Sequence, residues 1–189
     1  MTSSTAPSYT WQIKPSDRLT AQIMTTDTDY PLSVQTDYSQ AASLTGNAFQ
    51  INYNHQGAHS RVNASYSDYS PEFRADLGFI SQVDVRRLQI NPNYVWRFNN
   101  SGFNAAFVFG QVSRSEDQDG IELEQGGTFG GGFDGPLQSH IETGVNIYER
   151  FYNGQYFDQK ARYFFGQVQP WGGSQLRINV NAGDRKSVV

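Results

Sequence analysis

The chain has 189 residues, a formal net charge of −4 and no cysteine. This length suits one all-β domain or a piece of a larger one, and the missing cysteines exclude disulfides and thiolate metal sites. The acidic balance gives no basic surface for nucleic acid, and the absence of any run of about 18 apolar residues excludes a transmembrane helix.

The two ends of the chain differ from its middle. Residues 1–17 are predicted to be a lead-in, because Met1 to Ser8 lacks the basic start and apolar core of a signal peptide. An exported protein needs such a signal, so we expect either a protein that stays inside the cell or a fragment. Residues 184–189 match one reading frame of a common sequencing-adapter DNA and are interpreted as a non-native tail, with a chance match as the alternative. Residues 18–183 are then expected to form the barrel portion. If the tail is non-native, we expect the native chain to continue past Gly183.

Alternation of apolar and polar residues, the period of a β-strand, recurs along the chain. It predicts nine strands, at residues 18–27, 47–55, 59–68, 82–98, 102–113, 121–133, 137–149, 156–169 and 175–183. Several are longer than the 5–6 residues or so that are typical of soluble proteins, whereas a tilted strand needs about 9–11 residues to cross a bilayer.

The predicted connections alternate in length. Short turns fall at 56–58, 99–101, 134–136 and 170–174, and long connections at 28–46, 69–82, 114–120 and 150–155. Short turns at one end and longer loops at the other are typical of outer-membrane barrels. Aromatic residues near the strand ends, such as Trp96, Phe133 and Trp171, fit the girdles of such a barrel, although an aromatic core of a soluble β-protein is the alternative.

The strand predicted at 82–98 is irregular. Pro92 lies inside it, although proline in a sheet is confined to edges and bulges. Its apolar phase also changes between Val85 and Leu88. We expect either a bulge near Arg86–Arg87 or two shorter strands.

The segment before this strand, residues 69–82, is mixed in charge and aromatic content, and we expect a structured outer loop there that binds no ligand. Its charged residues are expected to face water, and its Phe and Leu residues are expected to pack onto the rim of the sheet. The block FRADLGFISQVDVRR and the strand ending in Trp96-Arg97-Phe98 resemble the C-terminal barrel of an uncharacterised bacterial family. In that family a periplasmic module similar to family-nine carbohydrate-binding domains precedes an outer-membrane β-barrel. The resemblance covers Phe73 to Phe98. It is specific at Phe73, Arg74, Asp76, Gly78, Phe79, Asp84 and Arg86. It implies a fold and a location in the outer membrane, and little about chemistry.

Charged residues lie between the apolar positions of the predicted strands. They are Arg61, Arg97, Glu122, Glu124, Glu142, Lys160, Arg162 and Arg177. We predict that this set faces a wet lumen, with Glu142 on the same side as Lys160 and Arg162, although the solvent side of a soluble sheet would look alike.

No catalytic or metal site is predicted. His55 and His59 flank the turn at Gln56–Gly57, but the spacing offers no third metal ligand. Ser139 and His140 are neighbours that point to opposite faces of a strand, so His140 is expected to face the lumen. The run Gly126–Gly132 lacks the lysine of a phosphate loop, and its glycines are expected to allow curvature or make room for a bulky neighbour.

The sequence therefore predicts a nine-strand portion of an antiparallel up-and-down transmembrane β-barrel in a bacterial outer membrane. The expected role is passive, as a channel, a transport component or an anchor, with no catalysis, no cofactor and no nucleic-acid partner. The expected partners are outer-membrane lipid and, through missing parts of the chain, a glycan or a periplasmic protein. A soluble all-β glycan-binding protein is the alternative, and an outer-membrane hydrolase associated with carbohydrate ranks third.

Overall fold

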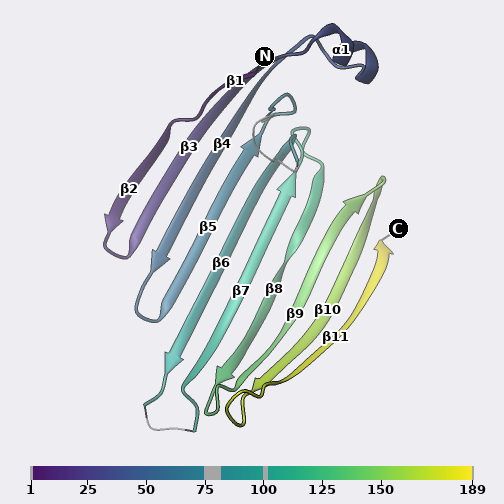
Figure 1. The fold of residues 1–189 in the computed structure, drawn as a ribbon. Coiled ribbons are helices and arrows are strands. Elements are labelled where there is room, and N and C mark those ends of the chain that lie inside the picture. Colours follow the sequence, from purple (N-terminus) through teal and green to yellow (C-terminus); the bar gives the residue numbers. More distant parts are fainter. Residues whose placement is uncertain (1, 75–81, 100–101, 189) are drawn as a thin grey trace.

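The computed structural model describes residues 2–74, 82–99 and 102–188, and they form one antiparallel sheet. Strands adjacent in sequence lie side by side as an up-and-down meander (Figure 1). The strands are β1 (Thr2–Thr5), β2 (Ser8–Lys14), β3 (Asp17–Asp29), β4 (Ser43–Gln56), β5 (Ser60–Tyr69), β6 (Val85–Arg97), β7 (Ala105–Glu116), β8 (Glu122–Asp134), β9 (His140–Tyr152), β10 (Gln155–Val168) and β11 (Leu176–Val188). A short helix, α1 (Leu32–Tyr38), connects β3 to β4. The predicted all-β, antiparallel class is confirmed.

The sheet is a single curved layer that does not close on itself (Figure 1). One edge is formed by β1 and β2, which both pair with β3, and the other edge is formed by β11. In Figure 1 these two edges lie on opposite sides of the sheet. The structure therefore shows the predicted up-and-down order of strands. It does not show the predicted closure of the sheet into a barrel.

The predicted number of nine strands is wrong, because the lead-in also forms β-structure. β1 pairs with the far end of β3 and β2 with its beginning. Between them the Pro7 carbonyl accepts a hydrogen bond of 3.2 Å from the Ile23 N–H. The two segments thus form one edge strand interrupted at Pro7, which lacks an N–H for the ladder. When β1 and β2 are counted as one edge strand, the described part of the sheet has ten strands side by side.

The alternation of connection lengths holds only in the first half of the chain. Residues 30–42 and 70–84 are long connections, and 15–16 and 57–59 are tight turns. In the second half, β7 ends at Glu116 and β9 ends at Tyr152, each three residues later than predicted. Only Asn153 and Gly154 connect β9 to β10, with φ angles of 51° and 79°. Such positive angles suit a two-residue hairpin, so the expected long loop at 150–155 is wrong.

β6 is one continuous strand. Its register with β5 shows no shift, so the expected bulge near Arg86–Arg87 does not form. Asn91 and Pro92 have no paired residue on β7 in the described register. This is expected because proline has no N–H to donate to the neighbouring strand. The bulge lies instead on the other side of β7, between Ser115 and Glu116.

Residues directly opposite each other on paired strands point to the same side, so the registers sort the strands into two faces. We call the face that carries Ile90 and Phe129 the apolar face and the face that carries Gln89 and Thr128 the polar face. Apart from glycines, the buried strand residues of the polar face are Thr26, Thr28, Ala48, Val85, Ala105, Ser113 and Ser115, whereas on the apolar face Asp17 is the one buried non-glycine residue of the described strands. The polar face is therefore the more enclosed of the two.

Candidate functional site

Large apolar side chains cover the apolar face from β2 to β11 and remain exposed. They include Trp11, Ile23, Leu88, Ile90, Tyr94, Trp96, Val108, Val112, Phe129, Phe133, Ile141, Ile147, Phe164, Leu176, Ile178 and Val180. Phe129, in the middle of the sheet, is 49% exposed, so no second layer covers it within the described part of the chain. Monomeric soluble proteins rarely expose contiguous apolar patches above a few hundred Å². An exposed apolar face of this extent is therefore unusual for a monomeric soluble protein.

Ion pairs lie at the end of the apolar face that is nearest the β5–β6 and β7–β8 connections. Arg86 lies between Asp68 and Glu116, with N···O distances of 3.4 and 3.7 Å. Arg114 pairs with Glu122 at 3.1 Å. Asp68, Arg86 and Glu116 stand opposite one another in one row across β5, β6 and β7, and Arg114 stands two residues further in along β7, opposite Leu88.

Aromatic residues lie toward the opposite end of the same face. The rings of Tyr94 and Trp96 are 4.7 Å apart and tilted by 57°. Along β6 the alternating apolar positions run from Leu88 to Trp96, about 26 Å at roughly 3.3 Å per residue. At a tilt of about 40° this corresponds to roughly 20 Å of height, slightly less than the apolar band of about 25 Å of an outer-membrane barrel.

The eight charged residues predicted to face a lumen do not share one face. Five lie on the polar face: Arg61, Arg97, Glu124, Glu142 and Arg177. Lys160 and Arg162 stand opposite Ile147 and Val145 on the apolar face, while Glu142 stands opposite Phe165. Glu122 pairs with Arg114 on the apolar side.

The predicted grouping of Glu142 with Lys160 and Arg162 is therefore wrong, for a reason visible in β10. Its aromatic residues Tyr163 and Phe165 suggested an apolar phase, but they lie on the polar face. Glu122 changes side because the bulge between Ser115 and Glu116 shifts the register by one residue.

An aromatic cluster surrounds His140 on the polar face. The imidazole stacks on Phe107 at 5.3 Å and 13°, and Phe165 lies 5.8 Å away on another strand. His140 Nδ1 is 2.7 Å from Asp134 Oδ1, and Nε2 is 3.5 Å from Glu142 Oε2. His140 is thus on the polar face, held by two carboxylates and two rings.

Glycines of β8 make room for this cluster. A Cβ at Gly132 would lie 2.7 Å from the Phe107 ring, and one at Gly130 would lie 2.6 Å from the Phe109 ring. The run of glycines therefore accommodates bulky side chains of the neighbouring strand, as the sequence predicted.

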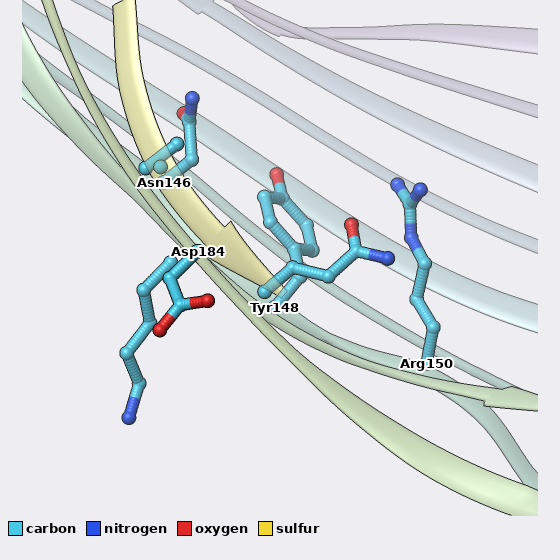
Figure 2. Close-up of a pocket in the computed structure, with 8 residues that line it drawn as sticks. Asn146, Tyr148, Arg150 and Asp184 are labelled. Carbon is cyan, nitrogen blue, oxygen red and sulfur yellow. The ribbon is translucent and has the colours of Figure 1, made fainter. Parts of the chain in front are cut away.

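A second polar cluster surrounds a pocket near the opposite end of β9, where Asn146, Tyr148 and Arg150 lie on the same side of the sheet (Figure 2). The Arg150 guanidinium lies 5.5 Å from the centre of the Tyr148 ring and donates to Glu124 at 2.5 Å. Lys160 and Asp184 also line the pocket, so it presents charges of both signs beside hydrogen-bonding side chains.

The residues that carry the family resemblance anchor the β5–β6 connection. Phe73 is 2% exposed and packs against the Gly46 backbone and Tyr69, whose ring centre is 5.6 Å away. The Arg74 N–H donates to Thr26 Oγ1 at 3.2 Å, which ties this connection to β3. The expectation that an aromatic residue of this loop packs onto the sheet is confirmed for Phe73.

Two further residues that carry the family resemblance, Asp84 and Arg86, make contacts at the start of β6. Asp84 has a φ of 57°, and its carboxylate accepts the Gln118 N–H at 3.1 Å. Arg86 forms the ion pairs with Asp68 and Glu116. Asp76, Gly78 and Phe79 lie outside the described residues.

A third cluster lies where β3, β4 and β5 meet at the tight turn 57–59. His55 Nδ1 is 2.8 Å from Asp17 Oδ1, and His55 Nε2 is 3.1 Å from Ser60 Oγ. Ser16 and Tyr53 also donate to the Asp17 carboxylate. These hydrogen bonds, led by that of Ser16, hold the pKa of Asp17 well below its ordinary value. Asp17 is the first residue of β3, beyond the apolar positions of that strand.

Sequence reasoning found His55 but neither of its partners. Asp17 was assigned to the lead-in, and Ser60 is an ordinary polar residue at a strand start. The sequence signal at this site was the histidine beside a tight turn that contains glycine. Pairing of β3 with β4 and of β4 with β5 brings the three together. The other histidine at this turn, His59, is instead bonded to the Val95 carbonyl at 3.0 Å.

Among the described residues, no three histidine or acidic side chains are grouped to hold a metal ion. The helix in the described ranges is not long and apolar enough to cross a membrane. Comparison with known proteins found no matching family model, no similar curated protein and no similar solved structure.

Proposed function

We propose that this chain is part of an outer-membrane β-barrel whose apolar face lies against lipid and whose polar face lines an aqueous interior. The observation that carries the proposal is the continuous exposed apolar face opposite a polar, more enclosed one. A soluble protein hides its apolar face, whereas a barrel in a bilayer turns it outward.

The lengths of the strands support the same proposal. β3 to β11 have 10 to 14 residues each, which matches the length needed to cross a bilayer at a tilt. The open edges need partners, because unpaired backbone groups are costly in lipid. We infer that further strands pair with the edges formed by β1–β2 and β11, and that the family resemblance at Phe73 to Phe98 reflects the same architecture.

The proposed role is passive. The polar face carries mixed charges, paired as in Arg150 with Glu124, and this suits a water-filled interior or an anchoring barrel. Phe73 packs at the end of the sheet where β5 leads to β6, and would narrow an opening there.

Tryptophan fluorescence in vesicles tests the proposal. Trp96 is 43% exposed on the apolar face, near the strand ends at the 98–104 connection. We expect lipids with quenchers near the headgroup to quench Trp96 more than lipids with quenchers at the chain end, in a variant where Trp11 and Trp171 are replaced by Phe. Trp96→Phe in the same background should remove this quenching.

Cell fractionation provides the second readout. The full-length protein should sediment with outer membranes and migrate faster on a gel before boiling than after. Recovery as a soluble monomer without detergent, with no quenching by lipid, would contradict the proposal and favour the soluble glycan-binding alternative.

A further inference from the structure

The cluster at the turn 57–59 has the order of hydrogen bonds found in serine hydrolases. Ser60 Oγ is 3.1 Å from His55 Nε2, and His55 Nδ1 is 2.8 Å from Asp17 Oδ1. When Nδ1 carries the proton and donates to Asp17, Nε2 is free to accept the Ser60 hydroxyl proton. The sequence alone could not place a nucleophile, a base and an acid together; the paired strands do.

The carboxylate that orients the histidine is itself held in place. Ser16 Oγ donates to Asp17 Oδ2 at 2.6 Å and the Tyr53 hydroxyl to Oδ1 at 2.5 Å. The Asp17 side chain is 12% exposed and that of His55 is 27% exposed. The base is therefore accessible while its orienting group is enclosed, as a working triad requires.

The tight turn lies directly against the hydroxyl. A Cβ at Gly57 would stand 2.9 Å from Ser60 Oγ and 3.0 Å from His55 Nε2, so a side chain there would crowd both groups. The Gly57 N–H donates to the Ser60 carbonyl at 2.8 Å. In the part of the chain that the structure describes, the N–H groups of Ala58 and His59 donate to no acceptor. Backbone N–H groups are the donors with which many hydrolases stabilise a developing oxyanion.

An apolar groove of about 400 Å³ begins at Ser60 and crosses the apolar face toward β8. It is lined by Ser60, Val62, Pro92, Tyr94, Val108 and Phe129, and passes over Gly110. The volume lies within the range of small-ligand sites, about 300–1,000 Å³. A hydroxyl at one end of an apolar groove matches an ester whose acyl chain lies in the groove.

We propose that Ser60, His55 and Asp17 form a hydrolytic site for acyl esters with an apolar chain, of the kind carried by membrane lipids. Ser60 Oγ attacks the ester carbonyl carbon while His55 Nε2 takes its proton. The tetrahedral intermediate collapses with cleavage of the C–O bond, and His55 gives the proton to the leaving alcohol. Water then attacks the acyl-serine, passes a proton to His55 and releases the carboxylic acid, which restores the Ser60 hydroxyl.

The full chain, folded in detergent micelles, tests the catalytic part. The probes are nitrophenyl esters of butyrate and dodecanoate and a fluorophosphonate that labels activated serines. We expect hydrolysis and labelling by the unmodified protein, and a loss of at least about 100-fold on Ser60→Ala or Asp17→Asn. Ser65→Ala, on the polar face of the same strand, should retain both.

Gly110→Leu tests the substrate class. A Cβ there would be 3.4 Å from the Phe129 ring and 3.5 Å from Pro92, so the backbone tolerates a side chain that fills the groove. We expect dodecanoate hydrolysis to fall at least 10-fold more than butyrate hydrolysis. Equal loss for both esters would overturn the acyl-chain assignment.

Absence of hydrolysis and labelling in protein that is folded by circular dichroism would overturn the catalytic proposal, as would full activity of Ser60→Ala. The lipid substrate class rests on the proposed membrane location, but the butyrate and fluorophosphonate assays do not need a membrane. Failure of the quenching test together with serine labelling would therefore leave a soluble esterase, and the two failures are distinguishable.

Discussion

His140 connects three strands on the polar face through its ring and its two nitrogens. It stacks on Phe107 of β7, lies beside Phe165 of β10 and reaches Asp134 at the end of β8. One side chain thus contributes to both aromatic packing and hydrogen bonding where the turn 135–139 brings β8 and β9 together.

Two substitutions separate these contributions. His140→Phe should keep the stacking and lose the Asp134 hydrogen bond, which lowers the free energy of unfolding by about 0.5–1.5 kcal/mol. His140→Ala should lose a further 0.5–1.5 kcal/mol or so for each ring contact. Denaturant unfolding in detergent measures both, and equal values for the two variants would show that the ring contacts contribute nothing.

Among the strands, β8 carries glycines that leave room for the bulky side chains of β7. Its glycines stand beside β7, whose Phe107 and Phe109 lie over them. Gly144 of β9 does the same for Tyr163 of β10, because a Cβ there would be 2.6 Å from the Tyr163 ring. Aromatic rings therefore lie on the polar face opposite Gly130, Gly132 and Gly144, and the ring of Tyr163 is one reason why the phase of β10 misled the sequence analysis.

Gly132→Ala should accordingly destabilise the sheet. Its Cβ would lie 2.0 Å from the Ile141 carbonyl oxygen and 2.7 Å from the Phe107 ring, so β8 or β9 must shift, at a cost of about 1–3 kcal/mol or more. Gly172→Ala is the matched control, since nothing lies within 4 Å of the added Cβ. Its free energy of unfolding should change by less than about 0.5 kcal/mol. A control that is as unstable as Gly132→Ala would refute the packing explanation.

At the scale of the whole molecule, the two faces predict opposite responses to charge. Ile90 and Gln89 are neighbours on β6 that point to the apolar and the polar face. Ile90→Arg should lower the free energy of unfolding of the vesicle-inserted protein by about 2–4 kcal/mol, because the guanidinium would face lipid. Gln89→Arg should change it little. Urea titration of vesicle-bound protein measures both, and an equal tolerance of the two arginines would argue against lipid on the apolar face.

The sequence by itself determined the β class, the antiparallel order and most strand positions, because a period of two is a local property of each segment. It also placed Phe73 against the sheet and located the glycines beside bulky neighbours. Its two-residue period could not decide which side Lys160, Arg162 and Glu122 occupy, since apolar residues stand on both sides of β10 and a bulge at Ser115 shifts the register. Only the pairing of strands decided those positions. The same pairing brought Asp17 and Ser60 to His55, because register joins residues that are far apart along the chain.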